Sequence, residues 1–464
     1  MGLFGAIASV ANGFQLVPTG TQSGSDAASA PTGTDAAAAP ALLAAQAQAP
    51  LAPLTPLSGP LRAQANEIAA RASGASVRGG YLGELGALFA PAEGSPGLGA
   101  SYEAFAQSWR GLAANPRDPA LAQTVIQRGD TLAGSVRTLA GGVETLATRI
   151  GGDVTAGLQD LNQTLVDIHH ENRTIATQAA LDQPSDDDEA KRDALVAKVV
   201  DMTGANVFPR ENRGVALYTA SGQVLLDGRP SQFTSTAATG PVPINAVSAD
   251  GKITDGRLGA LLRLAADGSK ATPPRAPDPA PDAEIVRKLR SQLDAVAGTA
   301  LARTKPKQPT SLSDAYDMAI PGNSSELGFG FFVGTGRHDL QVNPDLLSGA
   351  KTLKTDAATA VTASLGAGGR QLAADGLNLS NASYGQFAGL VANIWGGLGA
   401  GADRDAKIAT TANTLMTGYR QSGGTIDVQS EVTALTTVQD ALGTTRRIGH
   451  ALGDFLRSLE QVAA

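Results

Sequence analysis

The sequence predicts an α+β protein in which a long helical coiled coil or bundle, built from N-terminal and C-terminal segments, carries an inserted β-rich middle domain. Three observations predict this class. No proline interrupts residues 120–183, and apolar residues recur there about every seven residues. A second repeat of similar period begins at Val428 and continues toward the C-terminus. Between the two repeats, short alternating stretches separated by glycine-containing turns are typical of β-hairpins.

Composition restricts the possible functions. The chain has 464 residues, enough for two to four domains, and it has no cysteine, which excludes disulfides and thiolate chemistry. Its net charge of −7 argues against a nucleic-acid partner, because phosphate binding needs clustered Lys and Arg. Aromatic residues make up only 4% of the chain, which favours thin helical layers over a thick core. The first basic residue is Arg62 and no apolar run reaches about 18 residues, so we expect neither a cleavable signal peptide nor a membrane contact.

Residues 1–60 are expected to contain a short amphipathic helix followed by a disordered segment. Leu3, Ile7, Val10 and Phe14 have helical spacing, whereas residues 18–60 are rich in Ala, Pro, Gly, Ser and Thr and almost uncharged. Residues 61–185 are then expected to form a helical rod segment. Its predicted helices span residues 61–73, 81–89 and 101–112, and the long segment follows.

The long segment begins after LAANPRDPALA (residues 112–122), where Asp118 is a plausible N-cap and Pro119 suits the first helical turn. Its apolar residues are spaced alternately four and three apart, as in a heptad seam, with a stutter at Val154 and Leu158. Asn172 occupies one later seam position, where a polar residue can fix register. Such a helix needs a partner along its length, from C-proximal helices or another subunit. The predicted seam residues are Leu132, Val136, Leu139, Val143, Leu146, Ile150, Leu158, Leu161, Leu165 and Ile168.

Residues 186–345 are expected to form the β-rich middle domain with a linker. Hairpins are predicted over residues 207–229 and 241–258, and strands over residues 327–344. Residues 270–283 hold five prolines and are predicted to form a linker, with a helix over residues 283–301 after it.

Residues 346–464 are expected to be a C-terminal helical segment that pairs with the rod. One helix is predicted over residues 407–419 and another from Val428 onward. The residues predicted to carry assembly and chaperone binding on the last helix are Val428, Leu435, Leu442, Leu452, Phe455 and Leu459.

The motifs that could carry chemistry are better explained as structural features. His169, His170 and Glu171 are consecutive, whereas metal pairs on helices use i and i+4 spacing. The acidic run at residues 186–189 suits a helix N-terminus, and GLGAGA at residues 397–402 reads as a flexible joint rather than a nucleotide loop. We therefore expect no enzyme, and no catalytic, cofactor or metal site.

Several motifs occur in the same order as in one known family. They include LRAQANE at residue 61, LAANPRDPALA at 112, RDALVAKVVDMTGANV at 192, SGQVLLDG at 221 and SGGTIDVQSEVTALTTVQDAL at 422. Together they make the chain resemble the flagellar hook-associated protein 1 family, the hook–filament junction proteins, over about three quarters of its length. It diverges at the N-terminus, where residues 18–60 replace the family's usual "NIANANTPGYSRQ" type of segment.

The resemblance implies a structural molecule of the bacterial flagellum, needed for flagellum assembly and motility. It implies type III secretion to the cell exterior without a cleavable signal peptide, and a cytoplasmic export chaperone that holds the C-terminal helix. The expected partners are further copies in a homo-oligomeric ring, the hook protein and the second junction protein. Two alternatives stay open: another flagellar axial protein, or a type III secreted coiled-coil effector or adaptor.

Overall fold

A computed structural model describes residues 59–90, 97–238, 241–266, 285–301, 311–318, 330–368, 370–375 and 377–421. Four predicted features lie outside these residues: the helix within residues 1–17, the disorder of residues 18–60 up to residue 58, the linker over residues 270–283 and the helix from Val428 onward. The α+β class with a helical bundle is confirmed, since long helices dominate the described chain and its sheets are small.

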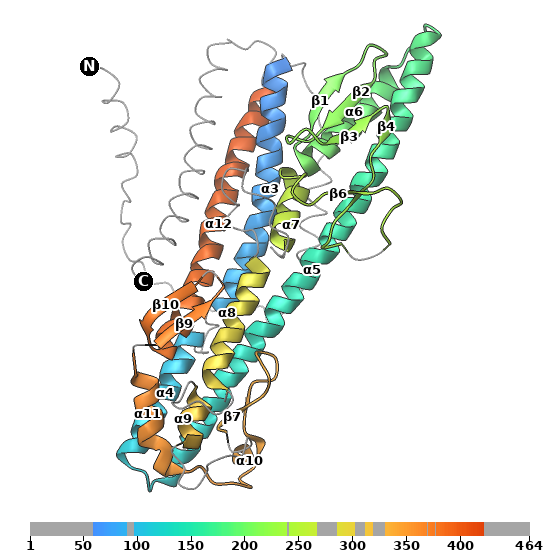
Figure 1. The fold of residues 1–464 in the computed structure, drawn as a ribbon. Helices are drawn as coiled ribbons and strands as arrows, with labels where there is room; N and C mark the ends of the chain where they lie inside the picture. Colours follow the sequence, from blue (N-terminus) through green and yellow to red (C-terminus); the bar gives the residue numbers. More distant parts are fainter. Residues whose placement is uncertain are drawn as a thin grey trace, which may run out of the picture. The chain divides into compact units, whose positions relative to one another are not determined.

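The long helix is α5, Pro119–Ala180, and its 62 residues make it about 90 Å long (Figure 1). It begins as predicted, because the Asp118 carboxylate accepts hydrogen bonds from the Ala120 and Leu121 amides, at 2.8 and 3.4 Å, and Pro119 follows directly. Helix α6, Asp186–Thr203, comes next, with the acidic run in its first turn as predicted.

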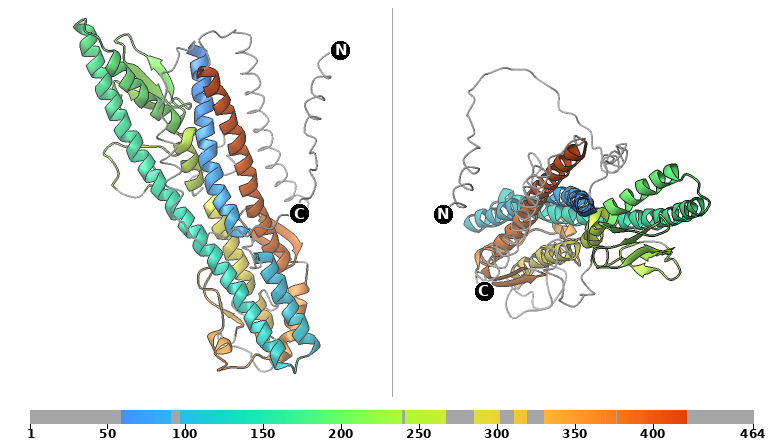
Figure 2. Two further views of the ribbon diagram at one scale, coloured as in Figure 1. Left: turned by 180° about the vertical axis from the view of Figure 1, so that it is seen from behind. Right: turned by 90° about the horizontal axis from the view of Figure 1, so that it is seen from above.

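Helix α3, Gly59–Phe89, lies side by side with α12, Tyr384–Gln421 (Figures 1 and 2). The prediction of two separate helices over residues 61–73 and 81–89 was wrong, because α3 continues through the intervening glycines. At Gly79, a Cβ atom would stand 2.7 Å from the Ala406 Cβ, so the close contact with α12 requires the residue that intrinsic helix propensity disfavours.

The predicted joint at residues 397–402 was also wrong, because α12 runs through it without a break. The helix predicted over residues 407–419 is the later part of this same element. Helix α4, Leu98–Ala114, contains the predicted helix over residues 101–112 and packs against α5 and α12.

The middle region is mixed rather than mainly β. Besides α6, it contains the helices α7, Gly256–Ala265, α8, Ile285–Ala300, and α9, Leu312–Met318. Helix α7 packs on α3, α5 and α6, and α8 packs on α5, so both join the helical bundle. The domain boundaries given above stay a prediction.

The four-stranded antiparallel sheet has the order β1, β2, β3, β4. The predicted hairpin over residues 207–229 is confirmed, with its turn closed by the Thr219 amide on the Gln223 carbonyl at 2.9 Å. The strands are Asn206–Pro209, Val215–Tyr218, Val224–Asp227 and Arg229–Pro230.

The second predicted hairpin, over residues 241–258, was wrong. Strand β6, Val247–Ser248, instead pairs in parallel with β5, Phe233–Thr234, and α7 begins at Gly256. Two Asp-Gly pairs, at residues 250–251 and 255–256, suggested hairpin turns. The second pair instead stands at the start of α7. The strands predicted over residues 327–344 are confirmed as the antiparallel pair β7, Phe332–Val333, and β8, Gln341–Val342.

Short elements complete the described chain before α12. They are α10, Pro344–Leu347, the 3-10 helix η1, Thr355–Ala357, α11, Ala358–Gly366, and the antiparallel pair β9, Arg370–Ala374, and β10, Leu377–Ala382. Helix α11 packs on α4 and α9, and β9 packs on α8, so this region covers one end of the bundle.

Candidate functional site: the buried face of the long helix

The predicted seam forms one buried face of α5. All ten predicted residues are at most 7% exposed, and Val154 at the stutter and the later Ile175 are fully buried with them. A stripe this long, without a break in burial, requires packing partners along most of the helix. The role of these residues in assembly stays a prediction.

The partners of this face come mostly from the middle of the chain. Helices α4, α6, α7 and α8 pack on α5, with a smaller contribution from α3. We expected C-proximal helices or another subunit to cover the seam, but the described C-proximal helix, α12, packs chiefly on α3 instead. Heptad spacing reveals that a face is buried but does not identify which helices cover it.

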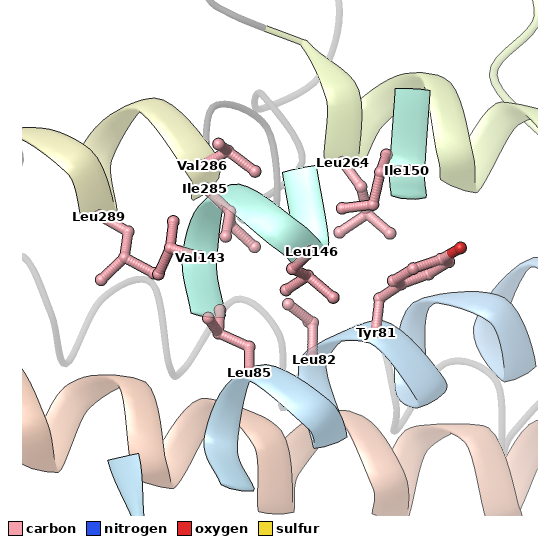
Figure 3. A pocket seen from close by; sticks show the side chains of 10 residues that line it. All are labelled: Tyr81, Leu82, Leu85, Val143, Leu146, Ile150, Leu264, Ile285, Val286 and Leu289. Carbon is pink, nitrogen blue, oxygen red and sulfur yellow. The ribbon is translucent and has the colours of Figure 1, made fainter. Parts of the chain in front are cut away.

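The centre of this packing is apolar and nearly solid. Figure 3 shows side chains from α3, α5, α7 and α8 converging around a void of about 10 Å³. That volume is close to the minimum for one water, and an apolar lining gives a water no hydrogen-bond partner. The void has no room for a cofactor. Its lining residues are Tyr81, Leu82, Leu85, Val143, Leu146, Ile150, Leu264, Ile285, Val286 and Leu289.

Polar and charged side chains at the edge of this apolar core connect α3 to α5. The Tyr81 hydroxyl donates to Asp153, and the Arg149 guanidinium pairs with Glu84 and lies 5.3 Å from the centre of the Tyr81 ring. Burial, together with the hydrogen bond to Asp153, raises the pKa of Tyr81 above its ordinary value. Tyr81 therefore stays neutral and serves as a donor at physiological pH.

A second polar group joins α5 to α8 and to the loop between β7 and β8. Glu144 accepts from Arg290 Nε and from Arg337 Nη2, each at 2.9 Å, and Arg337 also pairs with Asp294. Burial alone would raise the pKa of Glu144, but the two guanidinium groups hold it below its ordinary value. The carboxylate thus remains ionised and links three segments that are far apart in the sequence.

An aromatic cluster packs α4 against α9 and β7. Phe105 and Trp109 are fully buried, and Trp109 contacts Phe331 edge-on with ring centres 5.5 Å apart. Tyr316 and Phe332 complete the cluster. Because aromatic residues are scarce in this chain, gathering five of them at one place gives the end of the bundle a specific core.

Asn172 has a role other than the predicted one. Its side-chain amide hydrogen-bonds the backbone of Val215 in β2, rather than a polar residue on a facing helix. Asn162 binds the backbone of Phe233 in the same way. Asn162 could not be found from the sequence, because a single asparagine on a helix carries no periodic signal.

The pairing of α3 with α12 uses small residues instead of a large apolar seam, so heptad spacing does not reveal it. At Gly399 a Cβ atom would stand 2.7 Å from the Leu82 carbonyl oxygen and 3.0 Å from the Gly86 Cα. The two helices therefore approach until their backbones touch. The spacing of Gly79 and Gly86 on α3 could have indicated such a contact.

His169, His170 and Glu171 lie on α5. His170 and Glu171 line an open depression between α5 and α6 with Asp167 and Lys191. Within the described ranges, no group of three or more His, Cys, Asp or Glu side chains could hold a metal ion. In that same part of the chain, no helix is both long and apolar enough to cross a membrane.

Six predicted residues of the C-terminal helix lie outside the described residues. They are Val428, Leu435, Leu442, Leu452, Phe455 and Leu459. Their role in assembly and chaperone binding stays a prediction.

Comparisons with known proteins identify the helical part. Residues 82–306 match the family model described as the helical domain of the flagellar hook-associated protein FlgK. No curated protein sequence matches. Among solved structures, the flagellar hook junction protein FlgK from Burkholderia pseudomallei is similar, with a TM-score of 0.42 and 18% identity over 55% of this chain and 43% of that one.

The matched portion thus spans less than half of that protein's length. The region that matches the family model runs from Leu82, near the end of α3, through α8 and includes the whole buried face of α5. Residues 82–306 are thus similar to the helical domain of the flagellar hook-associated protein FlgK family.

Proposed function

We propose that this chain is a structural component of the bacterial flagellum that connects the hook to the filament. The observation that carries the proposal is the family match of residues 82–306, which coincides with the helices that pack around α5. An apolar interior with a void of about 10 Å³ agrees with a mechanical role, because such close packing resists deformation.

In this role, copies of the chain form a ring between the hook protein and the second junction protein, outside the cell. The chain leaves through the flagellar type III system. Support for this route comes from the family match of residues 82–306.

Deletion of the gene tests the junction role. The expected result is a strain with complete hooks, no attached filaments, and flagellin released into the medium. Expression of the full chain from a plasmid should restore filaments. Loss of the hooks themselves would instead identify a hook component, and normal motility would favour the secreted effector or adaptor.

We also propose that the C-terminal segment is held by a cytoplasmic export chaperone before secretion. The supporting observation is the apolar repeat from Val428 onward, which needs a cover until the chain assembles. Pull-down of the chaperone with the full chain, and with a chain ending at Gln421, tests this. Equal capture by both chains would refute the proposal, and a variant with Leu139→Asp serves as a control for general misfolding.

A further inference from the structure

Two asparagines of α5 each bind one strand residue through a matched pair of hydrogen bonds. Asn162 Nδ2 donates to the Phe233 carbonyl at 2.9 Å, and its Oδ1 accepts from the Phe233 amide at 2.7 Å. Asn172 makes the same pair of bonds with Val215, at 2.9 and 3.1 Å. A side-chain amide carries the same donor and acceptor as a peptide group, so each asparagine stands where a neighbouring strand would pair.

At Phe233 the asparagine occupies the second edge of β5. Strand β5 pairs with β6 through the Gln232 and Thr234 carbonyls, which accept from the Val247 and Ala249 amides at 2.7 Å. Because successive backbone groups of a strand point to opposite edges, the amide and carbonyl of Phe233 face away from β6. Within the described residues, β6 is the strand neighbour of β5, and Asn162 fills the other side.

Asn172 binds Val215 at a position where the neighbouring strand, β3, has already ended. The register pairs Leu217 with Leu226, so the position opposite Val215, two residues farther along, is Gly228. Gly228 has φ +70° and forms the turn between β3 and β4. Strand β2 therefore extends past the end of β3, and Asn172 satisfies the backbone groups left there.

We propose that Asn162 and Asn172 close these two strand positions against pairing with a strand from a second copy of the chain. A free strand position presents an amide and a carbonyl that template pairing with another chain. An apolar residue in place of either asparagine would leave both groups without a partner at a partly buried site. The proposal concerns the sheets alone and stands apart from the flagellar role.

The test uses the full chain with Asn162→Leu, Asn172→Leu and both together. We expect hydrogen exchange of the Phe233 amide to accelerate about tenfold in the first variant, and that of the Val215 amide in the second, since loss of a net 1 to 1.5 kcal/mol corresponds to about that factor. Light scattering should show the double variant associating at concentrations where the parent chain does not.

Gln163→Leu is the matched control, because it removes the neighbouring side-chain amide of α5, whose Nε2 donates to Asp167 on the same helix. It should change neither measurement. Unchanged exchange in the leucine variants would overturn the proposal, and so would faster exchange with no association beyond the control.

Folding of each variant is checked by far-UV circular dichroism. If the leucine variants do not fold, Asn162→Asp and Asn172→Asp decide the question, because they keep the shape and the acceptor but lose the donor. They should raise association above that of the parent, and the parent level would overturn the proposal.

Discussion

The buried face of α5 and the contact between α3 and α12 both join long helices, but they use opposite kinds of residue. The α5 face uses branched apolar side chains at heptad spacing, all at most 7% exposed. The α3–α12 contact uses glycine, and its backbones meet at Gly86 and Gly399. The first contact gains stability from apolar area, whereas the second depends on the absence of side chains. The two should therefore respond differently to substitution.

The largest effect is expected for Leu139→Asp on the α5 face. A carboxylate placed in this apolar packing has no partner, so the free energy of unfolding should fall by about 4 kcal/mol. Chemical denaturation followed by circular dichroism measures it. Thr138→Asp, at the exposed neighbouring position, is the control and should change stability little. Unchanged helicity and melting of the Leu139 variant would contradict the packing role of the seam.

A second effect separates the glycine contact from ordinary helix propensity. Gly399→Ala puts a methyl group 2.7 Å from the Leu82 carbonyl oxygen, and should cost about 2 kcal/mol. Gly397→Ala, two residues earlier on the exposed face, meets nothing within 4 Å and should stabilise the helix by about 0.5 to 1 kcal/mol. Thermal melting of both variants tests the opposite signs. Stabilisation by both would show that the helices are not in backbone contact.

Loss of charge at Glu144 should have a smaller effect on the α5 face. Glu144→Gln weakens the bonds to Arg290 and Arg337, and we expect a loss of about 1 to 2 kcal/mol near pH 7. The pKa of Glu144 is lowered in the folded chain, so its stabilisation is present above the unfolded pKa of about 4.3 and is lost as the pH falls through the folded value. The difference between parent and variant should therefore vanish in acid, and a constant difference from pH 7 to pH 3 would argue against the ionic contribution.

The smallest effect is expected at Asp317, beside the aromatic cluster. Burial, with the nearby Asp314 carboxylate, raises the pKa of Asp317 to about 6. Between pH about 4 and 6 the folded chain holds a proton that the unfolded chain has lost, so stability falls as the pH rises and levels off above about 6. Asp317→Asn removes this loss and should stabilise the chain at pH 7.5 by about 1 kcal/mol, a value reduced for the partial exposure of the side chain. Melting at pH 4 is the internal control, where parent and variant should agree.

Some elements were predictable because their signals are local. The start of α5 follows from one carboxylate and one proline, and its buried face follows from spacing alone. The hairpin around Ser221 also follows from local turn chemistry. In each case the residues that determine the structure are neighbours in the sequence, or repeat at the period of the element.

Other elements could not be predicted because the deciding contact lies far away in the chain. Gly399 has low helix propensity, yet it lies within α12, where close packing against α3 requires a residue without a side chain. The turn residues at 251–256 resemble a hairpin, yet α7 begins there because its apolar face packs on α3 and α5.

By itself, the sequence determined that a long helix starts at Asp118, that one face of it is buried, and which motifs align with the flagellar family. Only the tertiary structure decided what covers that face, which helix pairs with α12, and why Asn162 and Asn172 stand where they do. The physical reason is that periodicity records burial, which is a property of one segment, whereas partner choice depends on shape and hydrogen bonding between segments far apart in the chain.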